Sequence, residues 1–209
     1  MHDHLMSALR ENFGQTPSQT VGPYFAYGLT AAQYQYDFDQ PFDAVVASPH
    51  AEGEQILLEG VVYDGDGQPI VDAMIEIQQA DAQGRYAQVS DAPRATSQHN
   101  GFRGFGRCGT GTDAQHRYVF QTLKPGAHSP AEAPHINLIV LMRGMPLHAF
   151  TRVYFSDEAE ANARDAVLAA VPAERRETLV AQRTDANGRI VYRLDIHMQG
   201  PKETVFFDV

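Results

Sequence analysis

The residues best suited to hold a metal ion lie in one short window, Lys124–Leu138. His135 there precedes an apolar run that we expect to be a buried strand, on which residues two apart point to the same face. A His-x-His pair at this place could present two imidazoles to one ion. The second position is Asn137, whose neutral amide is a poor ligand for ferric iron. We therefore expect His135 to be a structural histidine.

The other reactive side chains favour structural roles. His128 and His148 are typical of loops or strand ends, and Tyr118 and Tyr154 are typical of strand residues packed in a core. A cysteine nucleophile needs a neighbouring base and a lowered pKa, and the sequence around Cys108 indicates neither. We expect Cys108 to be an inert, buried thiol.

The charge balance excludes several classes of function. The chain has 209 residues, a formal net charge of -10 and a pI near 5.2. It lacks the basic stripe of a nucleic-acid-binding protein and the glycine-rich loop of a nucleotide enzyme. An anionic substrate would need a local cation, and Arg143 after the apolar run 136–142 is a candidate. That run is too short to cross a bilayer, and the single cysteine favours a cytoplasmic location.

Short alternating or apolar segments separated by turn residues predict an all-β fold, a β-sandwich. The turn chemistry is clearest at Asp64–Pro69, Lys124–Gly126 and Asp185–Gly188. The expected strands are Ile56–Tyr63, Ala73–Gln78, Tyr118–Phe120, Ile136–Met142, Phe150–Phe155, Ile190–Met198 and Val205–Phe207.

Helical signal is confined to one insertion, about residues 157–178. Ser156–Glu158 offers an N-cap and first-turn acids for a helix over Ala159–Ala170, which Pro172 ends before a short turn at Ala173–Thr178. Residues 51–209 are thus predicted to form the sandwich. Residues 1–50 are predicted to be an arm that packs on the core and on a partner chain.

Two resemblances become visible once these segments are placed. Gly60–Ile77 resembles the strand–turn–strand opening of prealbumin-like sandwiches, which include purely structural proteins. Lys124–Pro125–Gly126 followed by Pro134–His135 resembles the intradiol ring-cleaving dioxygenases. That family carries Lys-Pro-Gly, then a ligand tyrosine, then Pro-x-His-x-His, with another ligand tyrosine upstream of a glycine-rich segment.

When this sequence is placed on the family's motifs, three of the four Fe(III) ligand positions carry a different residue. His128 or a near neighbour stands at the downstream tyrosine, His135 matches the first histidine, and Asn137 replaces the second. The upstream tyrosine position falls at or near Arg94, ahead of Gly101–Arg107. The resemblance thus implies a chain that does not bind iron itself.

That departure matches one branch of the family, in which an iron-free α chain pairs with a homologous iron-bearing β chain. It implies an αβ hetero-oligomer whose partner subunit ligates Fe(III). The assembly would cleave protocatechuate (3,4-dihydroxybenzoate) with O₂ to 3-carboxy-cis,cis-muconate. The segments that follow the α-chain pattern are Thr16–Tyr24, Ala133–Asn137, Arg143–Gly144, Thr151–Glu158, Arg175–Leu179 and Gly200–Asp208.

The same resemblance implies a substrate-binding role for five residues. Arg143 would lie near the substrate carboxylate, since a guanidinium offers paired donors that match it. The pocket wall would be formed by Thr20, Gly22, Pro23 and Tyr24. We expect no catalytic residue and no metal ligand from this chain.

Two other interpretations stay open at this point. One is a self-sufficient metalloenzyme that uses His135 with other histidines in an unfamiliar arrangement. The other is a prealbumin-like structural or carbohydrate-binding module without an enzymatic role.

Overall fold

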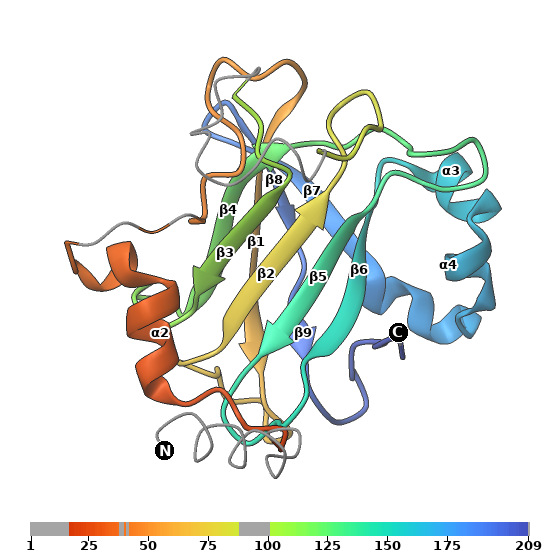
Figure 1. Cartoon of the computed structure of the whole chain (residues 1–209). Helices are drawn as coiled ribbons and strands as arrows, with labels where there is room; N and C mark the ends of the chain where they lie inside the picture. The colour runs from red at the N-terminus through yellow and green to blue at the C-terminus, as the bar shows by residue number, and fades with distance from the viewer. Residues whose placement is uncertain (1–16, 38–39, 41, 88–100, 209) are drawn as a thin grey trace, which may run out of the picture.

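The chain folds into a two-layered β-sandwich, as predicted (Figure 1). The computed structural model describes residues 17–37, 40, 42–87 and 101–208. One layer has the strand order β3-β2-β5-β6 and the other β7-β8-β1-β4, while β9 pairs with β1. The bounds are β1 Gln55–Tyr63, β2 Met74–Gln79, β3 Phe105–Gly109, β4 Arg117–Leu123, β5 Ile136–Leu141, β6 Ala149–Phe155, β7 Val180–Ala186, β8 Arg189–Arg193 and β9 Ile196–His197.

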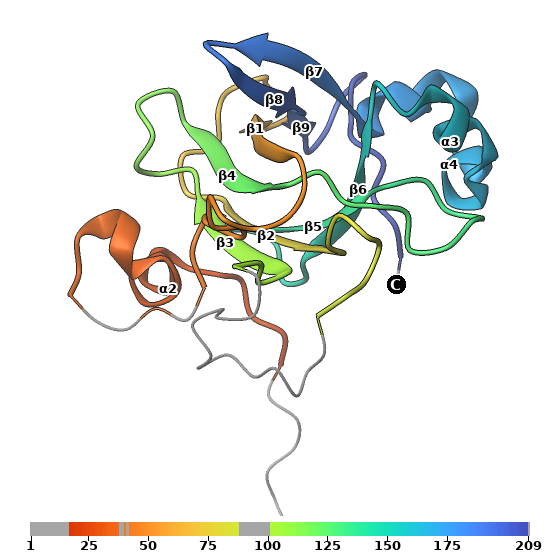
Figure 2. The ribbon, with the colours of Figure 1, turned by 90° about the horizontal axis from the view of Figure 1, so that it is seen from above.

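The alternation of buried and less buried residues along the strands builds the core between the layers. In β5 the buried positions are Ile136, Leu138 and Val140, and they face the same hydrophobic cluster as Leu58 and Phe120 of the other layer. The layers are also joined at one edge, where β6 and β7 share a short parallel pairing. Seen from above, the layers lie face to face (Figure 2).

The helical insertion lies at one side of the sandwich and the helix α2, Pro23–Leu29, at the opposite side (Figures 1 and 2). The single helix expected over Ala159–Ala170 is in fact two, α3 Ala159–Arg164 and α4 Ala166–Ala170, followed by the 3-10 helix η2 Ala173–Leu179. Asp165 divides them because its extended backbone starts a new helix. Its carboxylate accepts a hydrogen bond from the Leu168 N–H at 2.8 Å.

The prediction that helix is confined to the insertion is wrong. Residues assigned to the arm form α2 Pro23–Leu29 and the 3-10 helix η1 Ala31–Tyr34. Pro23 at the first position of α2 suits a helix start, because its missing N–H has no intrahelical partner there anyway. Pro17 and Pro23 favour an extended or turned segment up to residue 23, but the second of these prolines is the residue at which α2 begins.

The strand assignment needs correction at three places. The single strand expected over Ile190–Met198 is divided into β8 and β9. Phe105–Gly109, treated only as a glycine-rich segment, pairs with β2 as the edge strand β3. Val205–Phe207 forms only an isolated bridge between Phe207 and Phe150. Residues 1–16 of the expected arm lie outside the described residues, and its division from the sandwich stays a prediction. Among the described residues, no helix is long and apolar enough to cross a membrane.

The Asp165 carboxylate generates the first prediction. It is buried and also accepts hydrogen bonds from the Ala133 N–H at 2.9 Å and the Tyr154 hydroxyl at 3.0 Å. Asp165→Ala would leave these buried donors unpaired and should lower the free energy of unfolding by about 3 kcal/mol. Urea denaturation of the two proteins measures this change in the free energy of unfolding. The exposed Asp185→Ala is the control, expected within about 0.5 kcal/mol of wild type.

The contribution of Asp165 to the free energy of unfolding should decrease as the pH falls. Burial works to raise the pKa of Asp165, but the hydrogen bonds from Leu168 and Ala133 outweigh it and hold the pKa below its usual value. The stabilisation is therefore full above about pH 4 and is lost as the pH falls further. If the difference in unfolding free energy between wild type and Asp165→Ala stayed constant below about pH 4, this prediction would be contradicted.

Candidate functional site

Two of the predicted substrate-binding residues, far apart in sequence, lie together at the end of β5. The Thr20 hydroxyl donates to the Met142 carbonyl at 3.3 Å and accepts from the Gly144 N–H at 2.8 Å. These two contacts bracket Arg143, so the segment before α2 is fixed against the turn that carries the guanidinium. Gly144 adopts a φ of 87°, a left-handed conformation that glycine takes at little cost.

Arg143 is oriented by a residue that the sequence reading missed. Its Nε forms an ion pair with the Asp72 carboxylate, and its side chain is still 60% exposed. Among the described residues, the two terminal guanidinium nitrogens have no recorded partner. They can bind an anion from outside the chain. Asp72 follows a turn and has no sequence signal that distinguishes it from an ordinary turn aspartate.

The other three predicted residues continue the same segment. Gly22 is partly exposed and its carbonyl accepts from the Phe25 N–H at 3.1 Å. Pro23 and Tyr24 are the first two residues of α2 rather than part of an extended arm. Of the four residues predicted in the pocket wall, Thr20 is the one with a hydrogen bond to the Arg143 turn; Gly22, Pro23 and Tyr24 follow it in the chain, and the role of all five toward a substrate stays a prediction.

The residues that the family resemblance places at iron-ligand positions lie at the other end of β5. His135 is buried directly before the strand, with Nδ1 2.9 Å from the Ala133 carbonyl. Burial lowers its pKa, so the ring is neutral near pH 7. His128 packs its ring edge-on against Tyr86, at a centroid distance of 5.1 Å. Arg94 lies outside the described residues.

These residues do not fit a ferric site. Within the described ranges, no group of three or more histidine, cysteine, aspartate or glutamate side chains is arranged to hold a metal ion. Asn137 supplies an amide where an imidazole is needed, and the carboxylate of Asp165 is already occupied by three donors. We therefore assign no chemical step to iron held by this chain.

The Lys-Pro-Gly motif is retained here for structural reasons. The Lys124 ammonium lies 2.8 Å from the Asp157 carboxylate and 2.6 Å from that of Glu158, both at the start of the helical insertion. Gly126 passes so close to the next loop that a Cβ would come within 2.5 Å of the Ala82 carbonyl oxygen. The motif thus ties two loops together whether or not a ligand tyrosine follows it.

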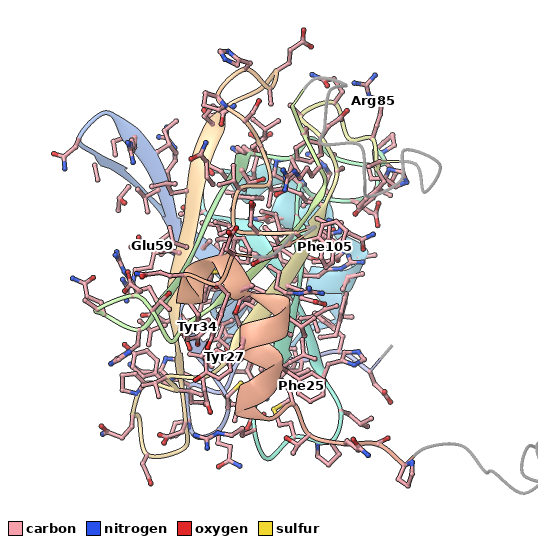
Figure 3. The ribbon with its side chains drawn as sticks, turned by 60° about the vertical axis from the view of Figure 1, so that its left-hand side comes forward. Phe25, Tyr27, Tyr34, Glu59, Arg85 and Phe105 are labelled. Carbon is pink, nitrogen blue, oxygen red and sulfur yellow. The ribbon has the colours of Figure 1, made fainter. Side chains whose placement is uncertain are left out.

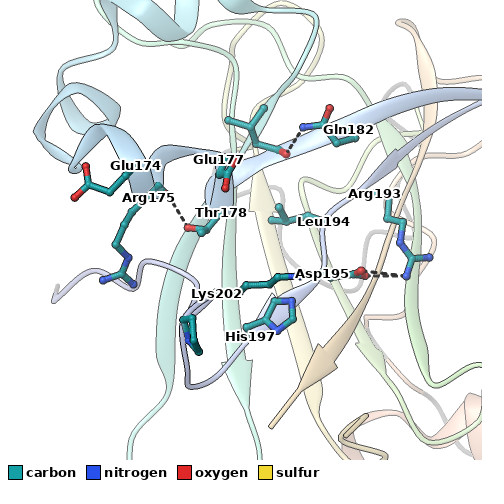
Figure 4. Close-up of a pocket in the computed structure, with 12 residues that line it drawn as sticks. Glu174, Arg175, Glu177, Thr178, Gln182, Arg193, Leu194, Asp195, His197 and Lys202 are labelled. Carbon is teal, nitrogen blue, oxygen red and sulfur yellow. Dashed lines mark hydrogen bonds and ion pairs between the residues drawn. The ribbon is translucent and has the colours of Figure 1, made fainter. Parts of the chain in front are cut away.

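A second candidate site is an open groove of about 430 Å³ beside η2 and β9 (Figure 4). Two of its arginines have partners within the chain: Arg193 lies 2.9 Å from Asp195, and the Arg175 guanidinium donates to the Glu203 carbonyl at 2.9 Å. The groove contains none of the predicted site residues.

Comparison with known proteins decides the family. A family model described as "Dioxygenase" matches residues 20–200. The protocatechuate 3,4-dioxygenase alpha chain of Burkholderia cepacia is 60% identical over 93% of this chain and 98% of that protein. This chain belongs to the intradiol dioxygenase family.

Within the intradiol dioxygenases the similarity favours the alpha type. The protocatechuate 3,4-dioxygenase beta chain of Burkholderia cepacia is 32% identical, over 73% of this chain and 67% of that one. A solved dioxygenase domain from Streptomyces sp. SirexAA-E, at 21% identity, shares the fold with a TM-score of 0.59 over 92% of this chain and 100% of that one. The predicted family, fold and subunit type are therefore confirmed, and the structural-module alternative is set aside.

The ion pairs of Lys124 with Asp157 and Glu158 give the second prediction. Burial works to lower the pKa of Lys124, but hydrogen bonds to Asp157 and Glu158 outweigh it and raise the pKa. Lys124→Met should cost about 2 kcal/mol of unfolding free energy near neutral pH. The contribution should persist up to the ordinary lysine pKa and fade as the pH rises beyond it.

The sequence provides a matched control. Lys202 is the only other lysine, and it is exposed. Lys202→Met should change the unfolding free energy by less than about 0.5 kcal/mol. Equal effects of the two substitutions in urea denaturation would show that the Lys124 contacts do not stabilise the fold.

Proposed function

We propose that this chain is the substrate-recognising, iron-free subunit of a cytoplasmic αβ protocatechuate 3,4-dioxygenase. The homologous β chain would hold Fe(III) and carry out ring cleavage by O₂. The α chain would bind the substrate carboxylate through Arg143 and form part of the pocket wall with Thr20, Gly22, Pro23 and Tyr24. The observation that carries the proposal is the position of Arg143 relative to the altered ligand positions.

Strand β5 keeps these two regions apart. His135 directly precedes the strand and Arg143 lies two residues after its end. At about 3.3 Å per residue, the six residues of β5 alone place roughly 20 Å between them. One benzene ring with its substituents cannot span that distance. Arg143 therefore has a use in recognition only if it completes a site whose iron belongs to another chain.

The chemistry of Arg143 suits a carboxylate on such a substrate. Asp72 engages Nε, while the Arg143 side chain as a whole stays mostly exposed. A carboxylate that accepts from these nitrogens in a partly desolvated interface would gain about 1.5–3 kcal/mol. The net charge of the chain is -10, so Glu203 and the other acidic side chains would repel anions elsewhere on its surface.

Exposed aromatic residues beside the Arg143 region support a partner surface. Phe25 and Tyr27 of α2 are 50% and 40% exposed, and the Tyr27 ring packs edge-on against Tyr34 at 4.9 Å (Figure 3). Aromatic residues are enriched in protein interfaces and costly to leave in water. Because α2 follows Thr20 directly, a β chain that covers these rings would also approach Arg143.

Substitution of Arg143 tests carboxylate recognition. In the reconstituted αβ enzyme, Arg143→Ala should lower kcat/KM for protocatechuate about ten- to a hundredfold. It should affect catechol, which lacks the carboxylate, much less. Arg189→Ala is the control, because this exposed arginine on β8 forms no ion pair with another described residue. Equal losses for the two substrates would rule out this role for Arg143.

Iron content tests the division of labour. The chain expressed alone should contain almost no iron and consume no oxygen with protocatechuate. The complex with its β chain should contain about one iron per αβ pair, because one set of ligands is then present. Metal analysis and an oxygen electrode measure the two quantities. Stoichiometric iron in the isolated α chain would favour the self-sufficient metalloenzyme instead.

A further inference from the structure

The side chain of Gln33 in η1 fastens the first helical segment to the edge of the sandwich. β3 is the outermost strand of its layer, so the side of its backbone that faces away from β2 is open to other partners. The Gln33 Oε1 accepts from the Gly109 N–H at 2.7 Å, and its Nε2 donates to the Gly109 carbonyl at 3.1 Å. One carboxamide thus pairs with both main-chain groups of Gly109, as a neighbouring strand would.

Gln33 also lies against the sulfur of a core cysteine. Its amide nitrogen donates to the Thr112 hydroxyl at 3.2 Å and lies 3.7 Å from the Cys108 Sγ. Cys108 is 3% exposed and belongs to the hydrophobic cluster between the layers. The sequence contains one cysteine, so the reactivity of its thiol reports on this place alone.

Little apolar packing holds residues 23–34, which we call the α2–η1 unit. Thr30 and Ala31 are buried, but no described residue of the unit belongs to the hydrophobic clusters of the sandwich. A segment with few apolar contacts to the core can detach at a lower free energy than global unfolding requires. The hydrogen bonds of Gln33 are therefore expected to decide how often the unit leaves β3.

The same attachment fixes the exposed aromatic rings of the unit. Tyr34 follows Gln33 directly, and a Cβ added at Gly111 would lie 2.5 Å from the Tyr34 hydroxyl oxygen, so η1 packs closely on the loop after β3. The ring of Tyr34 in turn contacts that of Tyr27 on α2 (Figure 3). A partner that packs on these rings therefore needs the unit in place on β3.

We infer that Gln33 is a positioning residue that holds the α2–η1 unit closed against β3, and that the homologous β chain binds the unit only in this closed form. Binding of the β chain then shifts the unit toward the closed form, because a ligand stabilises the form that it binds. The identity of the partner rests on the proposed function, whereas the closure by Gln33 does not.

Labelling of Cys108 with the disulfide reagent DTNB measures the opening of the unit in the full chain. Burial raises the pKa of this thiol to about 11, so the closed form contains almost no reactive thiolate near neutral pH. In the wild type, the labelling rate should rise with urea much less steeply than global unfolding does, because detachment exposes little surface. A labelling rate that follows global unfolding would overturn local opening.

Substitution of Gln33 tests its role in closure. Gln33→Leu keeps the approximate size of the side chain but removes its hydrogen bonds, so labelling of Cys108 should become about ten- to a hundredfold faster. Hydrogen exchange of the Gly109 amide, which Gln33 accepts from, should accelerate by a similar factor. Gln115→Leu makes the same change at an exposed position of the next loop and should leave both rates unchanged.

Wild-type rates in Gln33→Leu would overturn the closure assigned to this side chain. If the variant does not fold, the urea dependence of labelling in the wild type still decides whether the unit opens locally.

Addition of the homologous β chain tests the partner. A saturating amount should slow labelling at least about tenfold in the wild type and in Gln33→Leu alike, because binding draws the unit into the closed form. A complex that forms but leaves the labelling rate unchanged would overturn the partner assigned to this surface. If no complex forms on co-purification, the proposed function fails together with that partner, while the two rates measured in the chain alone still decide the role of Gln33.

Discussion

Strand β5 sets the constraint on which the rest of the structure depends, because its length is fixed and its residues alternate between the core and the outer face. Its inner residues build the sandwich core, and its two ends carry different chemistry about 20 Å apart. Arg143 at one end is paired with Asp72 and fastened to Thr20, while His135 and Asn137 stand at the other. Because a packed strand cannot shorten, one small substrate cannot use both ends in the same chain.

The motif residues around the predicted ligand positions make structural contacts that do not need a metal ion. Lys124 ties its loop to the helical insertion, and Gly126 permits a close backbone contact that no other residue allows. Asp165 fastens the insertion to Tyr154 and to the loop before β5. These contacts explain how a chain can keep the family's shape after its ligand positions have changed.

Sequence reasoning reached the sandwich and most strands because alternation and turn residues are local signals. It failed where the decisive interaction is long-range. The split at Asp165 depends on donors from Ala133 and Tyr154, and β3 is a strand because its backbone pairs with β2 despite two glycines. The short helix α2 has little periodicity to detect in seven residues.

The candidate site was predictable only in part. Arg143 and Thr20 could be named from the family resemblance, but their contact could not, since 122 residues separate Thr20 from Met142. Asp72 and Gln33 were missed altogether. The importance of each depends on a neighbour across a turn or at a strand edge, which no local pattern in the sequence records.

The most direct test of the central claim is a crystal structure of the αβ complex with bound protocatechuate, with anomalous diffraction at the iron edge. The account predicts that every protein ligand of the iron comes from the β chain. It also predicts that the Arg143 guanidinium lies within about 3 Å of the substrate carboxylate. Iron bound to His135 of this chain, or a substrate carboxylate remote from Arg143, would contradict it.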